Sequence, residues 1–166
     1  MKLSELMASV TPDDAFEGFA TNDDFVLAIN TKGTPGAATV GDYEVVQMGV
    51  TSHEASLETE TDDKQYIRTG KVSTKTGTQR TFSVSGDRYH GDAFQDWVLS
   101  NKVKFGHGAE VVADYVYFSI LTGKGEQGKV AVVVETDQGG EAGNNAEFSV
   151  ELMGQGTPTE YTYSAG

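Results

Sequence analysis

Residues 123–129 have the glycine and lysine spacing of a phosphate-binding loop, G-x-x-x-x-G-K. In such a loop a Ser or Thr after the lysine binds Mg²⁺, and backbone amides at the start of a helix hold the phosphate. Here Val130 stands in place of that hydroxyl, and strand-like patterns lie on both sides of the segment. We therefore interpret residues 123–129 as a turn between two strands.

Side chains able to act as nucleophiles or metal ligands are sparse. The chain has no Cys, which excludes thiolate chemistry and disulfides. Its three histidines, His53, His90 and His107, are far apart, and none lies in an H-x-x-x-H spacing. No G-x-S-x-G nucleophile motif occurs. We expect no enzymatic activity, no cofactor and no metal-dependent chemistry.

Paired carboxylates occur at residues 13–14, 23–24 and 62–63. Carboxylate pairs serve glycosidases and bind calcium. None of the three pairs matches a calcium-binding loop, and neighbouring residues of a strand point to opposite faces of the sheet. We interpret the pairs as solvated loop carboxylates and keep calcium binding as a minor alternative.

Five aromatic residues are candidates for a sugar-stacking platform: Tyr115, Tyr117, Phe118, Tyr161 and Tyr163. Such a platform would suit a carbohydrate-binding β-sandwich, and this is the main alternative of another functional class. Tyr115 and Tyr117 would share a strand face opposite Phe118, so these two could be exposed together. Core and interface packing is nevertheless the interpretation we favour.

The charge argues against nucleic-acid binding. Twenty-five acidic and 12 basic residues give a net charge of -13, which repels polyanions, and the basic residues form no dense cluster. No stretch approaches the roughly 20 apolar residues of a membrane span, and residues 1–10 lack the apolar core of a secretory signal. We expect no membrane partner.

The composition predicts a mainly β fold in one domain. Twenty glycines against three prolines, with many aromatic and β-branched residues, favour strands joined by glycine turns. Residues 1–166 would form this domain, with an N-terminal arm at 1–20 and a C-terminal tail or edge strand at 157–166. The expected strands are residues 25–30, 43–50, 80–86, 115–121, 129–136 and 146–153.

Two further segments interrupt this series. Within residues 91–101, Phe94, Trp97 and Val98 have the i, i+3, i+4 spacing of one helix that packs on a sheet. Residues 51–77 are rich in Thr, Ser and charged side chains, which predicts either a disordered loop or a long exposed hairpin that finds its partner in another subunit. The Thr content favours the hairpin.

Two strands alternate between apolar and polar residues. Phe82 and Val84 alternate with Thr81, Ser83 and Ser85 in one strand. The other strand alternates Phe148, Val150 and Leu152 with Glu147, Ser149 and Glu151. One face of each strand should therefore pack in the core while the other meets solvent.

The order of these elements over about residues 43–156 resembles the bacteriophage tail tube (major tail) proteins. It consists of a polar excursion, the strand T-F-S-V-S-G at 81–86, a helix around F-Q-D-W-V at 94–98 and a three-strand meander that ends in E-F-S-V-E-L-M-G-Q-G at 147–156. The resemblance implies an antiparallel β-sandwich or rolled barrel with one flanking helix. It also implies self-assembly into rings, usually hexameric, that stack into a hollow tube in the tail of a virion assembled in the bacterial cytoplasm.

The same resemblance implies partners and surfaces. Besides itself, the protein would contact tape-measure, tail-tip and terminator proteins and let DNA pass without adhesion. The polar alternating positions would line an acidic lumen: Thr81, Ser83, Ser85, Glu147, Ser149 and Glu151. Residues of the long loop would contact a neighbouring subunit: Glu58, Glu60, Asp62, Asp63, Lys64, Tyr66, Arg68, Lys71 and Lys75. A tube subunit of a contractile injection system or tailocin would share this fold.

Overall fold

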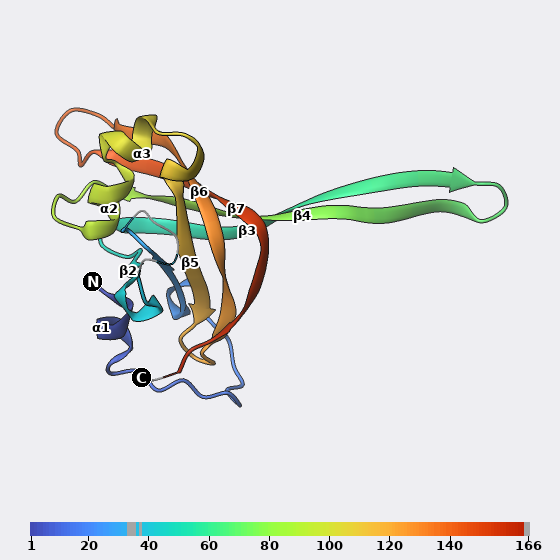
Figure 1. The fold of residues 1–166 in the computed structure, drawn as a ribbon, viewed down its shortest axis with the longest axis horizontal. Coiled ribbons are helices and arrows are strands. Elements are labelled where there is room, and N and C mark those ends of the chain that lie inside the picture. Colours follow the sequence, from blue (N-terminus) through green and yellow to red (C-terminus); the bar gives the residue numbers. More distant parts are fainter. Residues whose placement is uncertain (33–35, 37, 165–166) are drawn as a thin grey trace.

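The computed structural model of the protein describes residues 1–32, 36 and 38–164 (Figure 1). Its seven strands form one antiparallel sheet in the order β2-β1-β5-β6-β7-β4-β3. The strands are β1 (Phe25–Ile29), β2 (Glu44–Val45), β3 (Val50–Tyr66), β4 (Gly70–Asp87), β5 (Val112–Ser119), β6 (Lys124–Gly139) and β7 (Glu147–Thr162). The α-helices are α1 (Leu3–Met7), α2 (Ala93–Val98) and α3 (Asn101–Phe105), and the 3₁₀ turns are η1 (Asn22–Asp24), η2 (Val40–Asp42) and η3 (Gly108–Val111).

The sheet curls strongly without closing into a barrel. Phe82 on β4 packs edge-on against Tyr115 on β5 with ring centroids 5.1 Å apart, although β6 and β7 lie between those two strands in the sheet. Side chains from distant strands therefore meet on one curled face. The predicted mainly β, antiparallel rolled fold with a long hairpin is confirmed, and the sheet is open.

The core lies on this curled face and is covered by the helices. Buried residues of β1, β4, β5, β6 and β7 pack with Phe94 and Val98 of α2 and Val103 of α3. On the opposite face, β1 and β5 are covered by Leu3 and Met7 of α1. Strands β1 and β5 are thus buried on both faces, which explains why residues 25–29 are apolar without alternation.

Helix α2 forms where the apolar spacing predicted it, but it is shorter and a second helix follows. Asp92 caps α2 by accepting a hydrogen bond from the Gln95 amide at 3.1 Å. The Gln95 side chain is fully buried and donates to the carbonyl oxygens of Met48 (2.7 Å) and Asp87 (3.1 Å). These bonds attach α2 to the ends of β3 and β4. The described part of the chain contains no helix long and apolar enough to cross a membrane.

The polar excursion is a hairpin that leaves the body of the molecule. Strands β3 and β4 pair along their whole length, up to Tyr66 opposite Gly70, whereas β7 pairs with β4 only over residues 81–87. Residues 57–80 therefore form a two-stranded ribbon, which extends alone into solvent beyond Gln79 and Arg80 at its root (Figure 1). The hairpin interpretation of residues 51–77 is confirmed.

Several strand boundaries differ from those expected. Strand β5 lies at residues 112–119 instead of 115–121, and β6 covers residues 124–139 instead of 129–136. The predicted strand at 43–50 is reduced to β2, because the chain turns at Gly49, which has a φ of 71° and leaves no room for a Cβ beside the carbonyl oxygen of Asp87. Strand β7 continues beyond residue 153 to Thr162 by pairing with β6. Most of the segment expected as a tail or edge strand thus belongs to the sheet, and residues 165–166 lie outside the described part.

Candidate functional site

The six residues expected to line a lumen all lie on one face of the sheet. In the β4–β7 ladder Ser83 is opposite Glu151 and Ser85 is opposite Ser149, while Asp87 is opposite Glu147. The alternate residues of both strands, including Phe82 and Phe148, are buried on the other face. We call this surface the polar face; its members are Thr81, Ser83, Ser85, Asp87, Glu147, Ser149 and Glu151, with Ser52 and Glu54 from β3.

The polar face is acidic and built mainly from short side chains. Ser83 and Glu147 are exposed, but Thr81 is nearly buried at 4% exposure, so it offers little contact surface. A shallow hollow of about 280 Å³ opens where Asp87 and Glu147 lie beside Ser85 and Ser149. Glu54 of β3 adds a further carboxylate opposite Ser83. Such a surface repels phosphate groups.

The nine residues expected to contact a neighbouring subunit lie along the projecting hairpin. By register, alternate positions of β3 share one face, namely Glu58, Glu60, Asp62, Lys64 and Tyr66. On the other face Asp63 accepts from Lys71 at 3.2 Å, and hydrogen bonds from Ser73 and Lys71 lower the pKa of Asp63. Lys75 is opposite Thr61 beside a bulge, and Arg68 lies in the turn with a left-handed φ of 68°.

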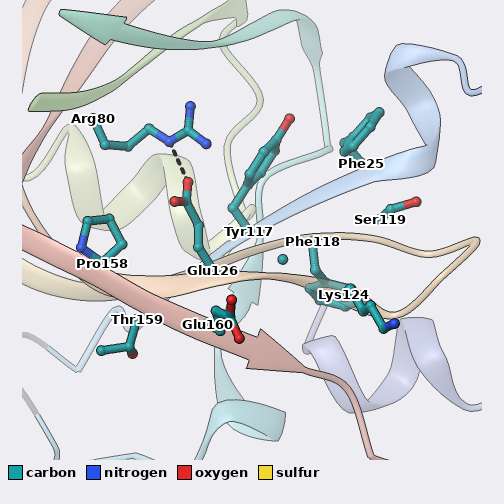
Figure 2. Close-up of a pocket in the computed structure, with 11 residues that line it drawn as sticks. Phe25, Arg80, Tyr117, Phe118, Ser119, Lys124, Glu126, Pro158, Thr159 and Glu160 are labelled. Carbon is teal, nitrogen blue, oxygen red and sulfur yellow. Dashed lines mark hydrogen bonds and ion pairs between the residues drawn. The ribbon is translucent and has the colours of Figure 1, made fainter. Parts of the chain in front are cut away.

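The root of the hairpin holds an ion pair that the sequence pattern did not reveal (Figure 2). The Arg80 Nε donates to a Glu126 carboxylate oxygen, and the guanidinium lies over the rings of Phe82 (5.4 Å) and Tyr117 (5.7 Å). Arg80, Glu126 and Tyr117 border an open pocket of about 330 Å³ next to Pro158. Arg80 occupies an apolar-face position of its strand, and this break in the alternation was the available signal.

The aromatic residues do not assemble into an exposed platform. Tyr115 and Phe118 are both 1% exposed. Phe118 packs under Tyr161 (5.4 Å between centroids) and Tyr163 (6.0 Å), while Tyr117 contacts Phe82 on the opposite face. Burial raises the pKa of Tyr117 and of Tyr161. The aromatic set is therefore used for packing, as favoured from the sequence.

The remaining motifs do not converge on a chemical site. Gly123 has a φ of 73° and ends the turn, and Lys124 already begins β6, so the interpretation of residues 123–129 as a turn is correct only for Gly123 and residues 124–129 belong to a strand. The Asp24 side chain accepts a hydrogen bond from the Thr21 amide at the start of η1. Asp62 and Asp63 lie on opposite faces of the ribbon. Within the described ranges, no group of three or more His, Asp or Glu side chains is arranged to hold a metal ion.

Neither a protein-family model nor a curated protein matches the sequence, but the fold matches solved structures. A chain in the tail of an empty gene transfer agent (GTA) particle, refined with C6 symmetry, has a TM-score of 0.58 at 16% identity over 87% of this chain and 100% of that one. A chain in the sheath–tube complex of an extracellular contractile injection system has a TM-score of 0.54 at 10% identity, over 96% and 97%.

A chain in the tube-terminating cap structure of the anti-feeding prophage has a TM-score of 0.51 at 15% identity, covering 95% of this chain and 100% of that one. These similarities extend over nearly the whole domain. The chain therefore has a fold like that of phage tail tube proteins, as its sequence pattern indicated.

Proposed function

We propose that this protein is a structural subunit of a phage tail tube. Copies associate into rings, with six subunits as in the C6-symmetric tail that the fold resembles, and the rings stack into a hollow conduit for DNA in the virion tail. The subunit performs no catalysis. Tape-measure, tail-tip and terminator proteins are its further partners, and assembly takes place in the bacterial cytoplasm.

The unsupported hairpin is the observation that carries this proposal. A two-stranded ribbon is marginally stable in water without packing on another element. Beyond Gln79 and Arg80 at its root, the ribbon lacks such packing, and it exposes Leu57 (60%) and Ile67 (91%) to solvent. Exposed apolar side chains on a ribbon that cannot serve the subunit's own core favour contact with another subunit.

The polar face supports a channel role for the opposite surface of the sheet. A lumen must exclude adhesion to phosphate, and carboxylates such as Glu147 and Glu151 do so by like-charge repulsion. Ser149 lies between these two glutamates on β7, and Ser83 is opposite Glu151, so short uncharged side chains separate the carboxylates. Together the polar face and the projecting hairpin give one subunit a conduit surface and a means of attachment.

Sedimentation and negative-stain electron microscopy over rising protein concentration test this proposal. We expect rings or tubes, formed either spontaneously or when purified tail-tip or terminator complexes provide an end. A protein that stays monomeric at every concentration and is not recruited by such complexes would contradict the proposal. Glycan binding by that monomer would favour the carbohydrate-binding alternative.

A tube subunit of a contractile injection system is a second candidate, because a chain from the sheath–tube complex of such an assembly shares the fold over 96% of this chain. The two candidates differ in the outer partner of the tube. Assembled tubes incubated with a sheath protein from the same genome should bind and order it if the tube belongs to a contractile particle. Tubes that bind no sheath would favour a non-contractile tail.

A further inference from the structure

The tip of the hairpin carries a charge opposite to that of the rest of the molecule. Residues 64–75 contain Lys64, Arg68, Lys71 and Lys75 and no acidic residue. The rest of the chain contains all 25 acidic residues but only eight of the 12 basic residues. A strongly acidic subunit therefore presents one cationic end, held away from its body by the ribbon (Figure 1).

The tip also exposes apolar side chains. Ile67 at the turn is 91% exposed, and Tyr66 and Val72 next to it are about half exposed. From Leu57 to Tyr66 the ribbon extends by roughly 30 Å at ~3.3 Å per residue. Since the tip points away from the body, this apolar and cationic surface is available to a second molecule.

A complementary surface lies in the segment that precedes β1. Residues 13–24, which we call the acidic arm, hold five carboxylates and no basic residue. Phe19 in the middle of the arm is fully exposed, and Phe16 is 39% exposed. The arm is attached at its start by the Asp13 amide, which donates to the Leu121 carbonyl oxygen at 2.8 Å, and at its end by the Thr21–Asp24 cap.

Several carboxylates of the acidic arm are already engaged within the subunit. Asp14 forms an ion pair with Lys124, Asp13 accepts a hydrogen bond from the Ala15 amide, and Asp24 accepts one from the Thr21 amide. Glu17 makes no ion pair or hydrogen bond within the described ranges, and it lies two residues from Phe19. Glu17 and Phe19 therefore offer a free negative charge beside a free apolar side chain.

We propose that the hairpin tip of one copy docks on the acidic arm of a second copy, with Ile67 against Phe19 and Arg68 near Glu17. The inference rests on the proposed self-association and names the two surfaces that meet. The polar face is also acidic, but it presents serines and carboxylates where the tip needs an apolar partner. Charge complementarity and exposed apolar area coincide on the acidic arm.

Site-specific crosslinking tests the contact, because the natural chain has no Cys. An Ile67→Cys variant is labelled with a benzophenone maleimide, mixed with unlabelled protein, irradiated and digested, and the crosslinked peptides are identified by mass spectrometry. We expect crosslinks to residues 13–24 of the unlabelled copy. The matched control carries the same label at Phe105→Cys, an exposed aromatic position on α3 that should not reach the acidic arm.

Charge reversal tests whether the tip and the arm attract each other. Arg68→Glu should lower the crosslink yield by about fivefold, since an exposed pair contributes about 0.2–1 kcal/mol and reversal adds repulsion. Adding Glu17→Arg to the same chain should restore the yield to within about twofold. Lys102→Glu, a reversal at an exposed residue of α3, should leave the yield unchanged.

The outcomes separate this inference from the proposed function. Crosslinks to the acidic arm in rings or small oligomers support the contact even if no tube grows. Tubes whose tip crosslinks map to the polar face or to α3 would overturn the contact and leave the tube subunit standing. Absence of crosslinks to the arm at all concentrations, or preferential crosslinking of the tip to DNA or anionic lipid vesicles added to the sample, would also overturn it.

Discussion

Arg80 is the residue that joins the hairpin to the body. Its guanidinium pairs with Glu126 and lies over Phe82 and Tyr117, and its side chain is only 16% exposed. Removing one member of a largely buried pair leaves the other carboxylate poorly solvated. Arg80→Ala should therefore lower the free energy of unfolding by about 1–2 kcal/mol, measured from the denaturant midpoint.

Arg80→Lys is the informative second variant at this site. A lysine keeps the charge but loses the planar contact with the two rings, so it should recover only part of the loss. Lys102→Ala on the exposed side of α3 is the control and should change the unfolding free energy by less than about 0.5 kcal/mol. Equal stability of wild type and both Arg80 variants would contradict a structural role for the stacked ion pair.

We expect His53 on β3 to make stability depend on pH. Its Nδ1 is buried without a hydrogen-bond partner among the described residues, and burial lowers its pKa, opposed by the charge of Asp23. Since the unfolded chain then binds a proton more readily than the folded one, stability should be complete above about pH 6.5 and fall as the pH drops toward the folded pKa. Thermal melts between pH 7.5 and 5.5 measure this slope.

A His53→Gln variant separates this effect from the titration of carboxylates. The variant should melt with a flatter pH dependence over that window, while His107→Gln on the exposed loop before η3 should behave like wild type. An unchanged slope in His53→Gln would show that other groups cause the acid sensitivity.

The sequence alone predicts on which face of the sheet the strand side chains lie, but it does not predict several contacts that stabilise the fold. The alternation of residues 81–86 and 147–152 placed six side chains on one face because the period of a strand leaves no other choice. His53 and Gln95 look like ordinary surface polar residues in the sequence, and the break in alternation at Arg80 does not indicate its partner Glu126. Their burial depends on the curl of the sheet, which brings β4 against β5 and α2 against the chain ends.

The hairpin is a separable element, because its residues pair only with each other beyond Leu57 and Arg80. Replacing residues 58–79 with Asn-Gly joins two directly paired residues through a favoured two-residue turn. We expect a cooperative thermal melt within a few degrees of wild type, together with loss of tube growth.

One control variant accompanies the hairpin truncation. Replacing Ile67 and Val72 with Thr keeps the ribbon but removes exposed apolar surface, and it should weaken growth without abolishing the fold. Loss of cooperative melting on truncation would assign the hairpin to the core of the subunit, and undiminished growth would remove it from the assembly contacts.

Element boundaries were least predictable where tertiary contacts override local pattern. Residues 43–50 have the composition of a strand, yet Gly49 turns the chain because Asp87 lies directly beside it. The helical stripe of residues 91–101 was correct for α2, but it gave no sign of the break before α3 at Asn101. The hairpin was predictable as an excursion because so few of its residues could serve a core.

At the scale of the whole molecule, charge is segregated along the long axis of the subunit. The cationic tip lies at one end, and the acidic polar face follows the sheet of the body (Figure 1). In a stack of rings this arrangement would place attraction at contacts between subunits and repulsion toward the conduit. The two surfaces can therefore be changed independently, because the tip mutations leave the polar face intact.

The lumen assignment predicts that Glu147→Lys with Glu151→Lys leaves assembly possible but impairs DNA passage. Each ring would present lysines to the phosphate backbone, so release of DNA from particles should slow about tenfold or more at low salt and recover as salt screens the charge. The matched control is Glu110→Lys with Glu141→Lys, which changes the net charge equally at exposed positions outside the polar face. If the control slows DNA release as much, or the polar-face variant releases DNA at the normal rate at low salt, the polar face does not line the conduit.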